Sequence, residues 1–137
     1  MPTPSAAWRV RVYYEDTDAA GIVYHANYLR FMERARTEWL RDLGYEQTRL
    51  RATDGVLFVI THADVRFLHP ARFDQELLVT TVLERLRRAS MTMHQRIEDD
   101  SGRGICAATN TIACVDAATL TPHRIPVHMT KVFDSAQ

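Results

Sequence analysis

The chain has 137 residues, 46% hydrophobic and 25% charged, a composition typical of one globular domain, spanning residues 1–137, that needs no disulfides. Seventeen basic and seventeen acidic side chains cancel, so no net charge favours a nucleic acid or an anionic membrane as a partner. No stretch approaches the roughly 18 consecutive apolar residues that a membrane-spanning helix requires.

The N-terminal third of the chain predicts one strand and one long helix. Residues 8–15 alternate between apolar and charged side chains, which indicates a half-buried strand. Residues 16–26 follow as a loop. Asn27 has the position of an N-cap for a helix over 27–43, whose apolar side chains recur every three or four residues on one face. Gly44 is typical of the residue that follows a helix C-terminus.

The rest of the chain predicts mainly strands. A short helix is expected over 46–53, followed by a turn at Asp54-Gly55. Four runs rich in β-branched, leucine and aromatic residues then predict consecutive strands at 56–68, 75–87, 90–99 and 104–116. A last short helix is expected over 127–133. One long helix beside a run of strands predicts an α+β protein with a five-stranded, mostly antiparallel sheet, whose edges favour pairing in a dimer.

The two cysteines, Cys106 and Cys114, are expected to be unpaired thiols. They lie in one predicted strand, where about 3.3 Å per residue puts their α-carbons roughly 26 Å apart, whereas a disulfide needs them within about 7 Å. Residues 1–8 also lack the basic and apolar segments of a signal peptide. Both features predict a protein of the reducing cytoplasm.

Residues 14–28, which leave the first strand and reach the start of the long helix, combine several features of a catalytic site. Asp16 and Asp18 place two carboxylates close together. Gly21 permits a positive φ or a close backbone approach. His25 can donate or accept a proton near neutral pH. The free N–H groups at the start of the helix, assisted by the helix dipole, can hold a developing oxyanion.

Each of these residues also has a purely structural interpretation. Aspartates before helices commonly cap turns, and His25 fits a capping or hydrogen-bonding role. Tyr14 and Tyr24 fit core or interface positions. From the residues alone, both interpretations stay open.

A long sequence pattern favours the catalytic interpretation. The chain carries Tyr14-x-Asp16-Thr17-Asp18-x-x-Gly21-x-Val23-Tyr24-x-x-x-Tyr28, followed by Glu33-Arg34-Ala35-Arg36-Thr37-Glu38. This pattern resembles the 4-hydroxybenzoyl-CoA thioesterase class of hotdog proteins, most closely the bacterial acyl-CoA thioesterases associated with the Tol–Pal envelope system. The similarity extends to Cys114-Val115-Asp116. It implies the hotdog fold, in which a curved five-stranded antiparallel sheet wraps a long central helix, and in which two sheets join in a dimer.

The resemblance also implies an acyl-CoA thioesterase activity and roles for individual residues. Asp18 is expected to carry the hydrolysis, as a general base or as a nucleophile, with His25 in the same pocket and Tyr14 positioning Asp18. Backbone N–H groups near residues 24–27 are expected to hold the carbonyl oxygen. The expected substrate-binding positions are Gly21, Val23, Tyr24 and Asn27. Short-chain or aromatic acyl groups are favoured, and the weak candidates for the CoA phosphates are Arg66, Arg72, Arg87 and Arg88.

Two other functions are weighed beside hydrolysis. A hotdog dehydratase or hydratase would transfer protons at carbon, but the Asp-x-Asp-x-x-Gly loop disfavours it. A scaffold of envelope or lipid-synthesis complexes, with residual thioesterase activity and acyl carrier protein as a possible partner, is the alternative. The remaining histidines lack the spacing of a metal site, and the pair His62-x-Asp64 favours a structural contact. We expect no metal and no tightly bound cofactor, and a homodimer or homotetramer.

Overall fold

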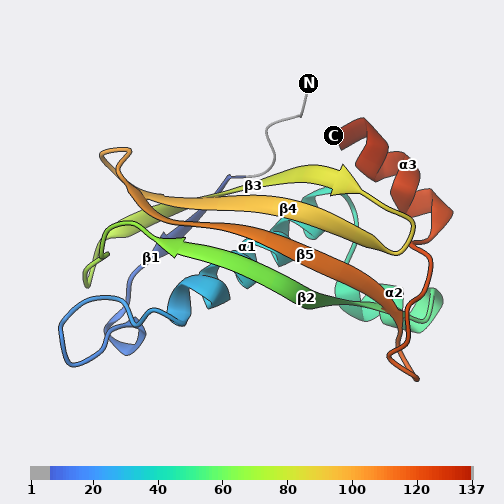
Figure 1. Cartoon of the computed structure of the whole chain (residues 1–137), viewed down its shortest axis with the longest axis horizontal. Helices are drawn as coiled ribbons and strands as arrows, with labels where there is room; N and C mark the ends of the chain where they lie inside the picture. The colour runs from blue at the N-terminus through green and yellow to red at the C-terminus, as the bar shows by residue number, and fades with distance from the viewer. Residues whose placement is uncertain (1–6, 137) are drawn as a thin grey trace.

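The structure, a computed structural model, describes residues 7–136 (Figure 1). The expectation about a signal peptide therefore lies almost entirely outside the described residues. The elements in chain order are β1 (Ala7–Arg11), a 3-10 turn (Tyr14–Asp16), α1 (Asn27–Asp42), α2 (Gln47–Thr53), β2 (Val56–Phe67), β3 (Glu76–Leu86), β4 (Ser90–Asp99), β5 (Gly104–Asp116) and α3 (Val127–Ala136). No helix within the described residues is long and apolar enough to cross a membrane.

Five strands form one antiparallel sheet in the order β1-β3-β4-β5-β2. Side chains on β3, β4 and β5 alternate between buried and partly exposed positions, as their sequence pattern predicts. The predicted strands and the five-stranded antiparallel sheet are therefore confirmed. The first strand is shorter than predicted: it ends at Arg11, because the chain then curls into the 3-10 turn, where the Tyr13 N–H donates to the Asp16 carboxylate (2.8 Å).

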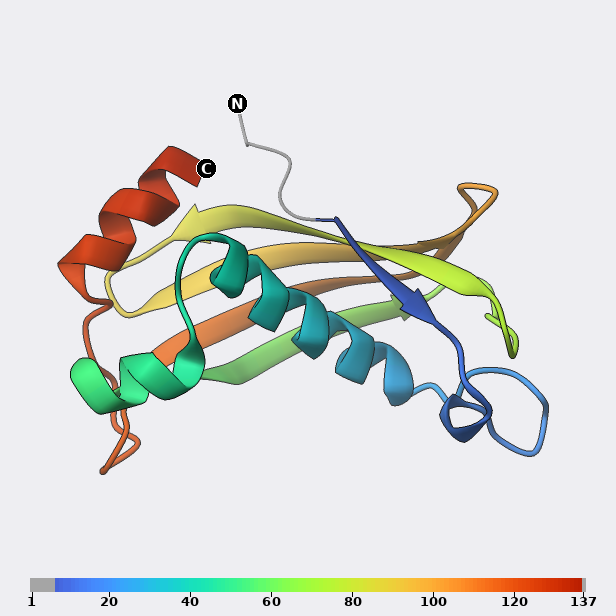
Figure 2. The same cartoon turned by 180° about the vertical axis from the view of Figure 1, so that it is seen from behind.

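Helix α1 packs its apolar stripe against one face of the sheet (Figure 2). Its end is built as predicted, because Gly44 has a φ of 96° and the Tyr45 N–H reaches back to the Leu40 carbonyl (2.9 Å), a Schellman arrangement. Its start differs from the prediction. Ala26 is the N-cap and Asn27 is the first helical residue, so the Asn27 side chain is free to bond elsewhere.

A buried polar cluster joins α1 to the middle of the sheet. The amide of Gln95 donates to the Met32 carbonyl (2.9 Å) and the Thr81 hydroxyl (3.0 Å), and its oxygen accepts from Arg36 (2.9 Å) and Asn110 (3.0 Å). Burial lowers the pKa of Arg36 from its ordinary value. All of these hydrogen bonds can form together only when α1 lies at one position along the sheet, so the cluster fixes that position.

Both cysteines are buried free thiols on β5, as expected, and burial raises the pKa of each to about 11. The sheet ends on one side at β2, which pairs only with β5. Most side chains of β2 are exposed, including Val59, Ile60 and Phe67. A twelve-residue edge strand thus leaves its outer backbone groups and several apolar side chains unpaired within the described chain.

Candidate active site

Asp16 anchors the segment between β1 and α1. Its carboxylate is buried and accepts from the Tyr13 N–H (2.8 Å) and from the Asn27 side-chain amide (2.9 Å). Its carbonyl accepts from the Tyr24 N–H (2.9 Å). The first contact closes the 3-10 turn, the second joins the loop to the first residue of α1, and the third joins the two ends of the loop. Asp16 therefore holds the segment in shape, and Asn27 takes part in that anchor.

Asp18 lies two residues further on, in an exposed turn. Its N–H donates to the Ile22 carbonyl (3.0 Å), and its carbonyl accepts from the Gly21 N–H (2.9 Å). One carboxylate oxygen accepts from the Ala20 N–H (2.9 Å), and no hydrogen bond within the described residues engages the other. Gly21 has a φ of 78°, which glycine adopts without strain, so the turn requires it. The turn therefore presents a fixed carboxylate with one free oxygen.

A cavity of about 320 Å³ opens beside this turn, between the start of α1 and the end of β2. Val23, His25 and Tyr28 line one side, and Phe67 and Leu68 line the other. The Phe67 ring lies 6.0 Å from the rings of both His25 and Tyr28, edge-on to His25. The predicted site residues Val23 and His25 thus meet in one apolar cavity, which is the kind of pocket that binds an organic ligand.

The backbone at the start of α1 supplies a small number of free donors. The Tyr24 and Asn27 N–H groups are already bonded, to the carbonyls of Asp16 (2.9 Å) and Tyr24 (2.8 Å). Within residues 7–136, the N–H groups of His25 and Ala26 have no hydrogen-bond acceptor. The expected oxyanion donors are thereby narrowed from residues 24–27 to these two, which lie at the positive end of the helix dipole.

Tyr14 and Tyr24 both have exposed rings. The Tyr14 ring is 82% exposed and edge-on to Phe73 (6.4 Å between ring centroids), in a separate cavity of about 380 Å³. No hydrogen bond in the described chain joins its hydroxyl to Asp18. Its carbonyl, however, accepts from the Thr17 N–H (3.1 Å) and hydroxyl (2.7 Å) beside Asp18. The Tyr24 ring is exposed and tilts against His25 (4.6 Å).

The candidate phosphate-binding arginines are spread over the molecule. Arg72 is close to the Asp18 turn, because its backbone bridges Ile22. Arg87 and Arg88 follow β3 at the opposite end of the sheet, where the Arg88 carbonyl accepts from the Ile125 N–H (2.9 Å). Arg66 lines a small cavity of about 180 Å³ with Asp64, His94 and neighbouring β5 residues. His62 and Asp64 are not hydrogen-bonded to each other in the described structure.

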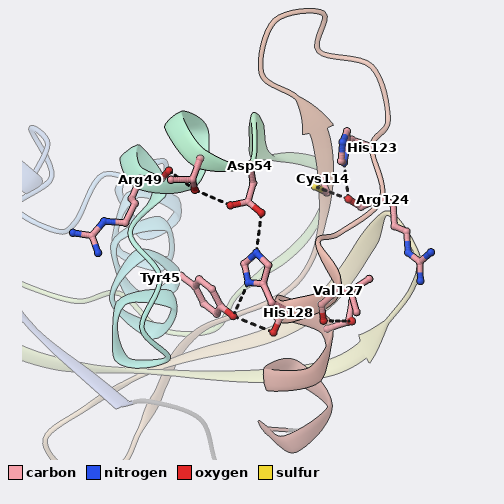
Figure 3. Close-up of polar contacts among 10 residues, drawn as sticks. Tyr45, Arg49, Asp54, Cys114, His123, Arg124, Val127 and His128 are labelled. Carbon is pink, nitrogen blue, oxygen red and sulfur yellow. Dashed lines mark hydrogen bonds and ion pairs between the residues drawn. The ribbon is translucent and has the colours of Figure 1, made fainter.

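A polar cluster that the sequence did not suggest ties α3 to the α1–α2 connection and to the end of α2 (Figure 3). His128 donates through Nε2 to the Asp54 carboxylate (2.8 Å), and its Nδ1 lies 3.2 Å from the Tyr45 hydroxyl. That hydroxyl donates to the His128 carbonyl (3.1 Å). The cluster lies at the end of the molecule opposite the Asp18 turn (Figure 1). No group of three or more potential metal ligands is found among residues 7–136.

Known proteins resemble the whole chain. A model of the thioesterase-like superfamily matches residues 12–133. The chain is 40% identical to Acyl-CoA thioester hydrolase YbgC of Escherichia coli O157:H7 over 133 residues, 97% of this chain and 98% of the relative. A probable thioesterase from Bartonella henselae superposes with a TM-score of 0.85 at 37% identity, covering 89% of this chain and 99% of that one. A mutant of 4-hydroxybenzoyl CoA thioesterase complexed with 4-hydroxybenzoyl CoA, at a TM-score of 0.88, 20% identity and coverage of 95% and 99%, has the same fold.

Proposed function

Because this chain belongs to the thioesterase-like superfamily, we propose that it is an acyl-CoA thioesterase, which hydrolyses an acyl-CoA to the free acid and CoA, and that Asp18 carries the reaction. The observation that carries the proposal is the geometry of the Asp18 turn. A nearly full-length relative is named an acyl-CoA thioester hydrolase, and Asp18 presents a free carboxylate oxygen beside the cavity of that same fold.

The reaction needs one base and one set of oxyanion donors. As a general base, Asp18 takes a proton from water while the water oxygen bonds to the thioester carbon. The carbonyl oxygen becomes an oxyanion, which the His25 and Ala26 N–H groups stabilise at the start of α1. The C–S bond then breaks, and the CoA thiolate leaves and takes up a proton. If Asp18 attacks directly instead, a mixed anhydride forms, and water releases the acid from it.

The cavity supports a small acyl group. Its volume of about 320 Å³ lies near the lower end of ligand pockets, which span roughly 300–1,000 Å³. Phe67, Leu68 and Tyr28 give it apolar and aromatic walls. We therefore favour short-chain or aromatic acyl groups, and thioesters of CoA over those of acyl carrier protein, because Arg72 near the turn offers a cation to a nucleotide phosphate.

We also propose that two copies join through β2 and complete a hotdog dimer around their long α1 helices. The outer edge of β2 is unpaired and exposes Val59, Ile60 and Phe67. Antiparallel pairing of this strand with its copy would join two five-stranded sheets and cover these side chains. Because Phe67 also lines the cavity, the partner would border each active site. We place the enzyme in the cytoplasm, where its two free thiols persist.

A thiol-release assay on short-chain, long-chain and aromatic acyl-CoAs tests the proposal. Asp18→Asn keeps the size of the side chain but removes the base, so kcat should fall at least about 100-fold. Glu15→Gln is the matched control, because it neutralises an exposed carboxylate in the same segment. It should stay within about threefold of the parent. Full turnover in a folded Asp18→Asn variant would contradict the role of Asp18, and no turnover of any acyl-CoA by the parent would favour a scaffold.

A further inference from the structure

Tyr28 is the one buried titratable side chain of the cavity that the mechanism above does not use. It is the second residue of α1, three positions after His25, is 4% exposed, and its ring forms part of the cavity wall. Its hydroxyl accepts a hydrogen bond from the Ala71 N–H (3.1 Å). A tyrosine hydroxyl also has one proton to donate, and within residues 7–136 that proton has no acceptor.

Two chain segments bring the Tyr28 hydroxyl close to the Asp18 turn. The carbonyl of Ala71, whose N–H bonds to Tyr28, accepts from the Val23 N–H (2.9 Å). Val23 follows Ile22, whose carbonyl accepts from the Asp18 N–H (3.0 Å). The hydroxyl and the Asp18 carboxylate are not directly hydrogen-bonded. The two groups are therefore close enough to interact electrostatically, without direct contact.

The pKa of Tyr28 is consistent with a nearby Asp18 carboxylate. Burial raises the pKa of Tyr28, and the nearby Cys106 thiol and Asp18 carboxylate raise it further, while the Ala71 N–H opposes the shift. Tyr28 therefore remains protonated, and so remains a donor, throughout the neutral range. A buried donor without an acceptor is unfavourable, so a group that accepts this proton is favoured at this position.

We propose that Tyr28 is a catalytic residue that donates a hydrogen bond to the water molecule activated by Asp18. A water between the two groups would accept from Tyr28 and donate to Asp18, which satisfies the unused proton and the free carboxylate oxygen together. One lone pair of the water would then be held by Tyr28, leaving the other to attack the thioester carbon. The inference rests on the proposed thioesterase function and adds a second residue to its machinery.

A purely structural role is the competing explanation. The Tyr28 hydroxyl supports the Ala71 N–H, so Tyr28→Phe should lower the thermal midpoint under either explanation. The readout must therefore separate catalysis from stability. We propose to measure kcat and KM of Tyr28→Phe well below its thermal midpoint. If Tyr28 holds the water, kcat should fall about 10- to 100-fold, the effect of one hydrogen bond to a group that develops charge, with KM within about threefold.

A double variant distinguishes a shared water from two independent effects. If Tyr28 and Asp18 act on one water, Tyr28→Phe should cost little once Asp18→Asn has removed the base, so the two losses should not multiply. Tyr45→Phe is the matched control. It deletes a tyrosine hydroxyl at the far end of the molecule, where it bonds His128, and it should lower stability while kcat stays within about twofold of the parent.

The outcomes separate this inference from the proposed function. A parent that hydrolyses no acyl-CoA would overturn the function itself. A parent that loses turnover with Asp18→Asn but not with Tyr28→Phe would leave the function standing and remove Tyr28 from it. Multiplicative losses in the double variant, or a Tyr28→Phe effect confined to KM, would likewise show that Tyr28 does not hold the water of Asp18.

Discussion

At the scale of single residues, the two aspartates of the site do different work although they are two positions apart. Asp16 is 6% exposed and accepts three hydrogen bonds, one within the 3-10 turn, one from the loop and one from the first residue of α1. Asp18 is exposed and holds its own turn through local bonds. One carboxylate therefore builds the loop, and the other is free for chemistry.

This difference predicts unequal effects of two alanine substitutions on stability. Asp16→Ala leaves the Tyr13 N–H and the buried Asn27 amide without acceptors, so the free energy of unfolding should fall by about 1–3 kcal/mol. Asp18→Ala removes an exposed side chain and should change it by less than about 0.5 kcal/mol. Urea denaturation measures both. Equal losses in the two variants would mean that Asp16 is not the anchor of the loop.

The sequence predicted this site only in part. The spacing of Asp16, Asp18, Gly21 and His25 identified the segment, but it did not say which aspartate is buried. The burial of Asp16 depends on Asn27, eleven positions further along the chain. Asn27 was expected to cap the helix, and its side-chain amide instead donates to the Asp16 carboxylate. The position of Tyr28 opposite Ala71 was also invisible, because it depends on a contact between residues 43 positions apart.

At the scale of elements, the periodic segments and the end of α1 at Gly44 were predictable, whereas the local shape of the loop between β1 and α1 was not. The strands from β2 to β5 are rich in β-branched, leucine and aromatic residues, and helix α1 has an apolar period of three to four residues. In β3, β4 and β5 the packed sheet then buries alternate side chains. The early end of β1 at Arg11 comes from the hydrogen bonds of the 3-10 turn, for which alternation gives no signal. Helix α3 extends to Ala136, beyond the predicted end at residue 133. Its Phe133 ring stacks on Trp39, with 5.4 Å between the ring centroids.

The contact between α3 and Asp54 predicts how the stability of the protein changes at low pH. The hydrogen bond from His128, and next that from Thr53, lower the pKa of Asp54 below its ordinary value of 3.8. A carboxyl group whose pKa is lowered by folding stabilises the fold at pH values above its ordinary pKa, and this contribution is lost as the pH falls through the lower folded value. Asp54 should therefore stabilise the protein above about pH 4 and lose this effect below it.

Thermal midpoints from pH 6 to about pH 2.5 test this expectation. The parent should be more stable than Asp54→Asn at pH 6, and the difference should shrink as the carboxyl group is protonated. The quantity to compare is the difference between the two thermal midpoints at each pH. Hydrogen bonds also lower the pKa values of Asp99 and Asp116, so protonation of these groups destabilises both proteins in acid. A constant difference across this range would mean that the Asp54 charge does not hold α3.

At the scale of the whole molecule, the chain separates its functions between two ends. The loop between β1 and α1, which contains the Asp18 turn, lies at one end of the sheet, and α2 and α3 lie at the other (Figure 1). The Tyr45–Asp54–His128 cluster belongs to this second end. The buried Gln95 cluster lies between them and fixes α1 against the sheet. Composition and element order were sufficient to predict this α+β architecture, because one long apolar-faced helix needs a sheet to cover it.

The proposed assembly is a property of the whole molecule, and it would depend on the edge strand β2. Ile60 is 44% exposed near the middle of that strand. If two copies pair along β2, Ile60→Lys should introduce a charge into the interface on both sides and shift the protein toward the monomer in sedimentation at micromolar concentration. Turnover should fall with it, because the partner would border the cavity beside Phe67.

Leu120→Lys provides the control for this experiment. Leu120 is an exposed aliphatic side chain, 62% exposed, in the turn that follows β5, so the substitution adds the same charge away from β2. It should leave both the molecular mass in solution and the turnover unchanged. A parent that sediments as a monomer, or an Ile60→Lys variant with the mass of the parent dimer, would exclude β2 as the interface. Loss of turnover together with the dimer would instead mean that a complete active site needs both copies.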